Sequence, residues 1–214
     1  MSEKKIGYDD AYSLKTPEDS IKLYKKWAET YDKDFAFDSN YLSPNKICNY
    51  FNKFKINTDT PILDVGAGTG LVGKCLYKTG NKKIIGIDIS KEMLVQAKLK
   101  KCYSSLVEAD VTKKIPFKNN YFGAIVSAGT FTHGHVGPDA FDELLRITKP
   151  GGLFVLSINS KVFIKNGFKD KFLSIKNNIT VPIFNEFKFH GNNKDKKFRE
   201  IKVFATIFRK KFNK

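Results

Sequence analysis

The sequence predicts an α/β fold with a doubly wound, mostly parallel sheet and helices on both faces. Short apolar runs alternate with stretches of helical periodicity between Pro61 and Asn159. Glycine, aspartate or serine follows most of these runs, as expected where strands turn into helices. The last third instead predicts two longer strands, Asn178 to Phe189 and Phe198 to Phe208. We therefore expect seven strands, with an antiparallel hairpin at the C-terminal end, and a helical cap before them.

The first 56 residues predict the helical cap. Thr16 and Pro17 are typical of an N-cap and a first helical position. A second helix is expected from Ser43 and Pro44. The stretch between them predicts a loop that contains the aromatic residues Phe35, Phe37 and Tyr41. For two aromatic residues of the first helix, Tyr24 and Trp27, packing on the sheet is favoured over lining a substrate pocket.

The most informative segment is a buried strand, Pro61 to Val65, followed by the glycine-rich turn Gly66-Ala67-Gly68-Thr69-Gly70. Glycine lets the backbone turn sharply, so that its N–H groups approach a ligand at the start of the next helix. Asp64 comes two residues before Gly66. A carboxylate there would repel a pyrophosphate, so it favours a cofactor with positive charge such as S-adenosylmethionine.

Another nucleoside cofactor fits part of this pattern. The frame from Gly68 to Gly73 satisfies the G-x-G-x-x-G motif of dinucleotide-binding proteins. Asp88 ends the next apolar run, where a carboxylate can accept hydrogen bonds from ribose hydroxyls of either cofactor. An NAD-dependent dehydrogenase is therefore an alternative, although Asp64 counts against it. A tight turn without any ligand is a third interpretation.

The remaining elements follow in order. Ser90 predicts the N-cap of a helix whose apolar residues include Met93. A short strand is expected from Leu106 to Asp110, and a buried strand from Phe122 to Ser127. The next helix ends in the turn Pro150-Gly151-Gly152, before a strand from Leu153 to Ile158. Lys161 to Lys176 predicts a basic, helical connector to the hairpin.

This series, from Pro61 to about Asn159, resembles the class I S-adenosylmethionine-dependent methyltransferases. The resemblance implies a Rossmann-like fold. It also implies that the glycine turn and Asp64 hold the methionine part of the cofactor, that Asp88 takes the ribose hydroxyls, and that Ser127 lies beside the reactive methyl group. The implied cofactor-binding residues are Tyr31, Asp64, Gly66, Ala67, Gly68, Gly70, Asp88, Ile89, Met93, Asp110, Val111 and Ser127.

Two of these residues have simpler interpretations. Ile89 and Met93 are implied to lie against the adenine, and Asp110, with Val111 as its neighbour, to meet the adenine amino group. Met93 alone would be read as ordinary helix core. Asp110 followed by Thr112 would be read as a turn.

The segment Gly129 to His135 is similar to a smaller group, the methyltransferases named for the Williams-Beuren syndrome chromosomal region (methyltransferase type 11/25 domains). Their loop after the fourth strand has a comparable Gly-Thr-Phe-Thr-His-Gly-His run. Trp27 to Asp32 also resembles the opening helix of that group and makes Tyr31 a candidate cofactor contact. The resemblance implies no particular methyl acceptor.

His133 and His135 are the candidate catalytic residues. The sulfonium methyl is already activated, so the protein needs a general base only if the acceptor arrives protonated. Histidine titrates near neutral pH and suits that role. A pair spaced by two residues also fits a metal site, but no nearby acid or cysteine completes a ligand set, so we expect no metal. His190, in the predicted hairpin turn, is expected at the surface.

The charge of the chain leaves the type of acceptor open. The formal net charge is +16. Residues 161 to 214 contribute +11 of it, from 15 Lys or Arg and 4 Asp or Glu. A basic hairpin suits RNA or another polyanion. However, only Arg146, Arg199 and Arg209 are arginines, and no RNA-binding module is recognisable. A small molecule methylated at oxygen, nitrogen or sulfur is favoured; a polyanion, or a non-catalytic module that only binds the cofactor, is the alternative.

Length and composition predict one domain over residues 1 to 214. It consists of the cap (1 to 56), the cofactor-binding core (57 to 160) and the basic hairpin region (161 to 214). No apolar run approaches the ~20 residues that cross a membrane, and the start lacks the apolar core of an export signal. Cys48, Cys75 and Cys102 lie outside any C-x-x-C pattern, as in reduced cytosolic proteins. We therefore expect a cytoplasmic protein without membrane contact.

Overall fold

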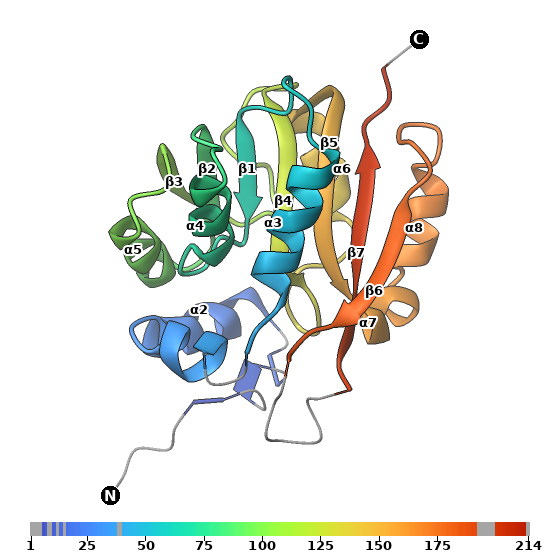
Figure 1. Ribbon diagram of the computed structural model, residues 1–214. Helices are drawn as coiled ribbons and strands as arrows, with labels where there is room; N and C mark the ends of the chain where they lie inside the picture. The colour runs from blue at the N-terminus through green and yellow to red at the C-terminus, as the bar shows by residue number, and fades with distance from the viewer. Residues whose placement is uncertain are drawn as a thin grey trace, which may run out of the picture.

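The computed structural model describes residues 6–7, 10–11, 13–14, 16–37, 40–191 and 200–212. Its centre is a seven-stranded sheet with the order β3-β2-β1-β4-β5-β7-β6 (Figure 1). β1 to β5 are parallel, whereas β7 pairs antiparallel with β5 and β6. The predicted sheet, including its hairpin, is confirmed. The strands are β1 Ile62–Val65, β2 Ile84–Asp88, β3 Ser105–Glu108, β4 Phe122–Phe131, β5 Thr148–Asn159, β6 Ile183–Lys188 and β7 Lys202–Arg209.

Helices cover both faces of this sheet. Ile47 of α3 and Leu76 of α4 belong to one buried cluster with Ile62 and Ile84. On the other face, α6, α7 and α8 bury a second cluster that contains many phenylalanines. The described helices are α2 Pro17–Trp27, α3 Ser43–Phe54, α4 Leu71–Lys78, α5 Lys91–Leu99, α6 Ala140–Ile147, α7 Ser160–Lys165 and α8 Phe168–Ser174, with a π-helix, η1 Asp32–Phe37.

The cap is smaller than the sequence predicts. α2 and η1 lie below the sheet in Figure 1, at the carboxyl ends of the parallel strands. The predicted N-cap is present, because the Thr16 side chain accepts a hydrogen bond from the Asp19 backbone at 3.1 Å. In contrast, α3 packs against β4, β5 and β7, because Ile47 and Phe51 fit the sheet core. It is therefore part of the layered core and not of the cap.

The stretch predicted as a loop forms η1. Phe35 is buried there, and its ring lies 5.4 Å from that of Trp27 and 5.2 Å from that of Tyr41. This packing among aromatic side chains gives the polar stretch a regular structure that its composition does not indicate. Phe37, in contrast, is 83% exposed.

His190 is buried, so its predicted surface position is wrong. It forms an isolated bridge with Tyr41 and packs against Phe189, with the two rings 4.5 Å apart. The bridge ties the end of β6 to the cap and removes the imidazole from solvent. The rest of the predicted turn, from Asn192 to Asp195, lies outside the described residues.

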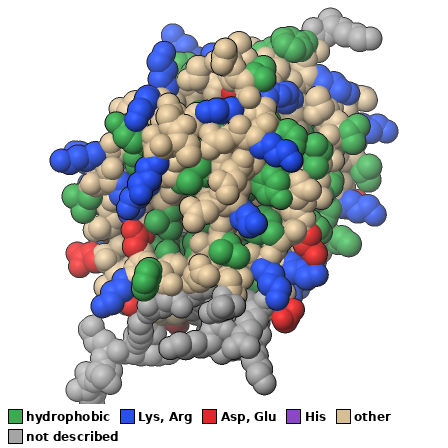
Figure 2. Space-filling view, in the orientation of Figure 1, with side chains coloured by type: hydrophobic (Ala, Val, Ile, Leu, Met, Phe, Trp, Pro, Cys, Tyr) green, Lys and Arg blue, Asp and Glu red, His purple; other side chains and the backbone are tan. Residues whose placement is uncertain are grey.

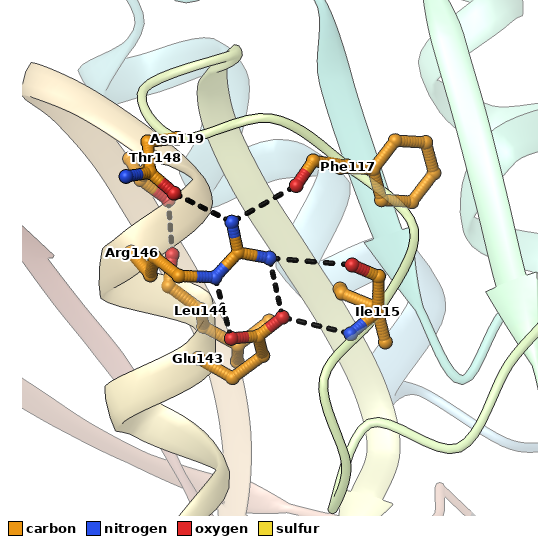
Figure 3. A network of polar contacts seen from close by, with 7 residues as sticks. All are labelled: Ile115, Phe117, Asn119, Glu143, Leu144, Arg146 and Thr148. Carbon is orange, nitrogen blue, oxygen red and sulfur yellow. Dashed lines mark hydrogen bonds and ion pairs between the residues drawn. The ribbon is translucent and has the colours of Figure 1, made fainter.

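No helix connects β3 to β4, so side-chain contacts hold residues 109 to 121 in place. Figure 3 shows the Arg146 guanidinium of α6 at the centre of these contacts. It donates to Glu143 through Nε at 2.7 Å and to the carbonyl of Phe117 at 2.9 Å. Glu143 in turn accepts from the backbone N–H of Ile115 at 2.8 Å. The connection is thereby attached to α6 along its length.

A second arginine joins the end of β7 to the loop before β1. Arg209 donates to both carboxylate oxygens of Asp59, at 2.7 and 2.9 Å, and to the carbonyls of Gly151 and Phe54. The Asp59 side chain is only 2% exposed. Arg146 and Arg209 are thus structural contacts rather than part of a surface for anions. Within the described residues, no helix is both long and apolar enough to cross a bilayer.

We expect Arg209→Met to lower the free energy of unfolding by roughly 3 kcal/mol, because it leaves the buried Asp59 carboxylate without its cation. Urea denaturation measures this change. Lys202→Met is the matched control, because the ion pair between Lys202 and Glu186 is exposed on both sides. Equal stability of Arg209→Met and wild type would contradict the structural role of this arginine.

Candidate active site

The candidate site lies where the carboxyl ends of β1, β2 and β4 meet the cap. In an open parallel sheet, ligands bind at this edge beside the strand from which the order reverses, which is β1 here. Asp88 ends β2 at this edge. Its carboxylate accepts from the backbone N–H of Gly68 at 2.8 Å and from that of Ser90 at 2.9 Å. Burial raises its pKa, and these backbone N–H donors oppose the rise.

The glycine turn needs glycine for two reasons. Gly66 and Gly68 have φ angles of 64° and 53°, which side chains rarely adopt. At Gly66 a Cβ would also lie 2.1 Å from the hydroxyl oxygen of Thr130. That hydroxyl and the hydroxyl of Ser127 both donate to the carbonyl of Val65, at 3.0 and 2.7 Å. The turn is therefore packed closely onto the end of β4.

A cavity, called here the first cavity, opens beside this turn. It has about 830 Å³ of empty space, which includes its open mouth. Asp88 lies in its wall between a glycine-lined side and an apolar side with Ile89 and Met93. Of the residues predicted from the sequence, those in its lining are Tyr31, Gly66, Gly68, Asp88, Ile89, Met93, Asp110, Val111 and His135.

Four predicted cofactor contacts lie outside this lining. Ala67 and Ser127 are buried, and the Ser127 hydroxyl donates its hydrogen bond to the Val65 carbonyl. Gly70 has a φ of 90° and lies against Ala97 of α5. Asp64 is fully buried and accepts from the hydroxyl of Tyr103 at 2.6 Å. These residues support the turn from beneath instead of facing the cavity.

Tyr103 explains the glycine that completes the dinucleotide-like motif. A Cβ at Gly73 would lie 2.2 Å from the Tyr103 ring, and Cβ atoms at Gly70 and Gly86 would lie 3.0 Å from it. The ring therefore fills a slot between α4 and β2, and its hydroxyl reaches Asp64. Gly73 makes room for a side chain rather than for a pyrophosphate. Sequence analysis did not identify Tyr103, because it lies 39 residues from Asp64.

Asp32 is a second residue that sequence analysis missed. Its carboxylate accepts from the hydroxyl of Thr69 at 2.5 Å and from the ammonium of Lys100 at 2.6 Å. Thr69 belongs to the glycine turn and Lys100 ends α5, whereas Asp32 begins η1. The Asp32 carboxylate thus links the cap to the glycine turn and to the end of α5.

The two candidate histidines differ in position. His135 Nε2 lies 2.8 Å from the hydroxyl of Tyr24, and its Nδ1 lies 2.7 Å from the carbonyl of His133. Burial lowers the pKa of His135. Burial also lowers the pKa of His133, together with the charges of Lys165 and Lys161. His135 lines the first cavity, but His133 does not.

A second, smaller cavity adjoins the first and was not predicted. Tyr24, Tyr31, Gly129 and His135 line both. The second cavity has about 400 Å³ of empty space including its mouth. Its lining is Ala11, Tyr24, Tyr31, Phe35, Tyr41, Gly129, Thr132, His133, His135 and Phe189. Tyr24 therefore lies in the cavity wall, so the favoured expectation that it packs on the sheet is wrong. Trp27 is buried, in a cluster with Phe35 and Tyr41.

Asp110 forms the predicted turn and also lies in the cavity wall. Its carboxylate accepts from the backbone and hydroxyl of Thr112, at 2.9 and 2.6 Å, which is the expected turn. It also lines the first cavity. Among the residues that the structure describes, no three His, Cys, Asp or Glu side chains are grouped closely enough to bind a metal.

Known proteins identify the class of this domain. The family model described as a methyltransferase domain matches residues 63–156. Methyltransferase-like protein 27 of Homo sapiens is 32% identical over 140 residues, covering 64% of this chain and 56% of that protein. Malonyl-[acyl-carrier protein] O-methyltransferase of Buchnera aphidicola is 33% identical over 135 residues, covering 62% and 54%. The match over residues 63–156 and these two relatives support a class I S-adenosylmethionine-dependent methyltransferase.

A solved structure agrees with the methyltransferase fold. The crystal structure of a Methanococcus maripaludis protein assigned as an S-adenosylmethionine-dependent methyltransferase superposes with a TM-score of 0.59. The two sequences are 23% identical, and the superposition covers 100% of this chain and 99% of the other. The class resemblance seen in the sequence is confirmed. The chain spans little more than half the length of the two curated relatives, so their acceptors do not transfer to it directly.

Asp64 should make the stability of the folded chain depend on pH. Burial raises the pKa of Asp64 to about 7, from an ordinary value near 4. The folded state therefore binds this proton more tightly than the unfolded chain does. The resulting stabilisation is complete below about pH 4 and is lost as the pH rises to about 7.

Asp64→Asn removes this titration, so we expect its stability relative to wild type to increase between pH 5 and pH 8. Urea denaturation at both values measures the difference. Asp170→Asn, which replaces an exposed acid on α8, is the control. Its stability relative to wild type should be the same at both pH values. An unchanged difference for Asp64→Asn would show that Asp64 is ionised throughout this range.

We also expect Asp32→Asn to loosen the cap. Loss of the charged contacts should lower the opening free energy of α2 and η1 by about 1 kcal/mol, since Asp32 is partly exposed. Amide hydrogen exchange measures this as faster exchange confined to these elements. Glu92→Gln is the control, because its contact with Lys25 of α2 is exposed and 4.0 Å long. Equal effects of both variants would contradict a special role for Asp32.

Proposed function

We propose that this protein binds S-adenosylmethionine in the first cavity and transfers its methyl group to a small-molecule acceptor. The observation that carries the proposal is the Asp88 carboxylate, which lies in the cavity wall beside Gly68. Each of its oxygens holds one backbone N–H and retains lone-pair capacity for a ribose hydroxyl. A ribose has two neighbouring hydroxyls, which suit the two oxygens.

The surroundings of Asp88 fit the other parts of the cofactor. Ile89 and Met93 offer an apolar wall for the adenine, and Asp110 can accept a hydrogen bond from its amino group. Gly66 and Gly68 leave room for the methionine part. Asp64, Ala67, Gly70 and Ser127 contribute by holding the turn in shape, and Tyr31 closes the cavity from the cap.

The cofactor supplies the chemistry. When bound, S-adenosylmethionine would supply an activated methyl group to the acceptor atom, and an acceptor that arrives protonated would have to lose its proton. The protein aligns the acceptor, excludes water and removes that proton where necessary. His135 is the candidate for this last role, because it lines both cavities and burial favours its neutral form. His133 positions it through a backbone carbonyl.

The dehydrogenase alternative loses its main support. The third glycine of its motif, Gly73, is accounted for by the Tyr103 ring.

A small acceptor is favoured over a polyanion. On the face shown in Figure 2, Lys and Arg side chains are scattered among other residues and do not form one continuous stripe. Arg146 and Arg209 make internal contacts. The second cavity, where an acceptor would lie beside the first, has no Lys or Arg among its described lining residues.

Calorimetric titration with S-adenosylmethionine, S-adenosylhomocysteine and NAD tests the proposed cofactor. We expect micromolar binding of both adenosyl ligands and none of NAD. Asp88→Ala should weaken adenosyl binding by about a hundredfold, because two hydrogen bonds to a charged acceptor are lost. Asp170→Asn on α8 is the control and should bind as wild type does.

Two outcomes would contradict the proposal. Binding of NAD in place of the adenosyl ligands would restore the dehydrogenase. Tight cofactor binding with no consumption of S-adenosylmethionine in an extract of small molecules would favour a non-catalytic binding module. In that case, changing His133 and His135 together to alanine should leave any partner interaction unaffected.

A further inference from the structure

The second cavity is an aromatic box. The rings of Tyr31 and Phe35 stack at 4.8 Å, Phe35 meets Tyr41 edge-on at 5.2 Å, and Tyr41 lies 4.8 Å from Phe189. Such ring contacts form a rigid, apolar wall. No Asp, Glu, Lys or Arg is present among its described lining residues. A charged occupant would lose its hydration there without gaining a partner of opposite charge, so an uncharged, planar molecule fits best.

A defined chain of hydrogen bonds begins at the junction of the two cavities. A carbonyl can only accept, so the contact between His135 Nδ1 and the His133 carbonyl requires a proton on Nδ1. In the neutral imidazole, Nε2 then carries the lone pair, and the Tyr24 hydroxyl donates to it. Tyr24 and His135 both line the two cavities. A proton that reaches the Tyr24 oxygen can therefore continue to His135.

The acidity of tyrosine restricts which acceptors can use this path. A proton passes easily through a tyrosine hydroxyl, with a pKa near 10, only from a group of similar acidity. An aliphatic alcohol is almost as weak an acid as water, whose pKa is about 15.7. An alkyl amine carries a positive charge at neutral pH, and the described walls offer no carboxylate to pair with it. A phenol matches both the path and the box.

We infer that the methyl acceptor is a compact, uncharged phenol held in the second cavity, and that Tyr24 and His135 relay its proton. This inference rests on the proposed function. The phenol O–H proton moves to the Tyr24 oxygen while the Tyr24 proton moves to His135 Nε2. The phenol oxygen bonds to the methyl carbon, and the electron pair of the broken sulfur–carbon bond stays on sulfur. The His135 imidazolium, held by the His133 carbonyl, returns its proton to solvent.

Binding tests the acceptor class without turnover. Calorimetry on the full chain saturated with S-adenosylhomocysteine should detect binding of phenol. Benzylamine and benzoate, which have the same ring but opposite charges, should bind at least about tenfold more weakly. Thr132→Asp, which adds a carboxylate to the second cavity alone, should abolish phenol binding and leave the affinity for S-adenosylhomocysteine unchanged.

Tyr24→Phe tests the relay, because it keeps the ring and removes only the hydroxyl. With phenol as acceptor, kcat should fall about a hundredfold with KM within about twofold of wild type. With 4-nitrophenol, which ionises more readily and so depends less on the relay, the fall in kcat should be smaller. Tyr121→Phe, an exposed tyrosine before β4, is the control and should behave as wild type does.

The outcomes separate this inference from the function on which it rests. No binding of S-adenosylhomocysteine would overturn the proposed function. Binding of S-adenosylhomocysteine without binding of phenol would overturn the acceptor class alone. Equal losses of kcat for phenol and 4-nitrophenol in Tyr24→Phe would overturn the relay.

Discussion

The Asp88 carboxylate is the interaction on which the geometry of the site depends. Two turns that follow neighbouring parallel strands would otherwise be independent loops. Asp88 joins them by taking Gly68 N–H with one oxygen and Ser90 N–H with the other. A buried carboxylate is stable only where donors surround it, so both turns are held close to it. The same group thus fixes the backbone of the pocket and is exposed to its interior.

The cap shapes two cavities at once. Tyr24 and Tyr31 lie in the walls of both, and Asp32 follows Tyr31 directly in the chain. A ligand that orders these residues in one cavity therefore changes the wall of the other. Linkage requires such an effect to be reciprocal between the two ligands. Cofactor and acceptor would then bind in a coupled manner through the first turn of η1 and the end of α2.

Most of the fold could be predicted from the sequence because its signals are local. The capping residues Thr16 and Ser90, the glycine turn and the apolar runs each act within a few residues, and the structure has elements at each of them. The position of α3 could not be predicted in this way. Its apolar face suits a cap or a sheet equally well, and only packing against β4 and β5 decides between them.

The site was predicted less completely for the same reason. Asp88, Gly68 and Asp110 occupy positions set by strand ends, and these were identified. The contacts of Asp32 with Thr69, of Tyr103 with Asp64 and of Tyr24 with His135 join residues 37, 39 and 111 positions apart. Nothing in the local sequence around either partner indicates such a pair. The position of Asp64 before the glycine turn was noted from the sequence. That its side chain points to Tyr103 and not into the cavity could not be predicted, because it depends on how the Tyr103 ring packs.

The single tryptophan of the chain gives the cap an optical property of its own. Trp27 is 1% exposed and lies within 6.3 Å of the rings of Tyr24, Tyr31 and Phe35, measured between centroids. Its emission therefore reports on this cluster and not on the sheet, which contains no indole. A rearrangement of the cap can be followed by intrinsic fluorescence in real time, without a label and without a substituted residue.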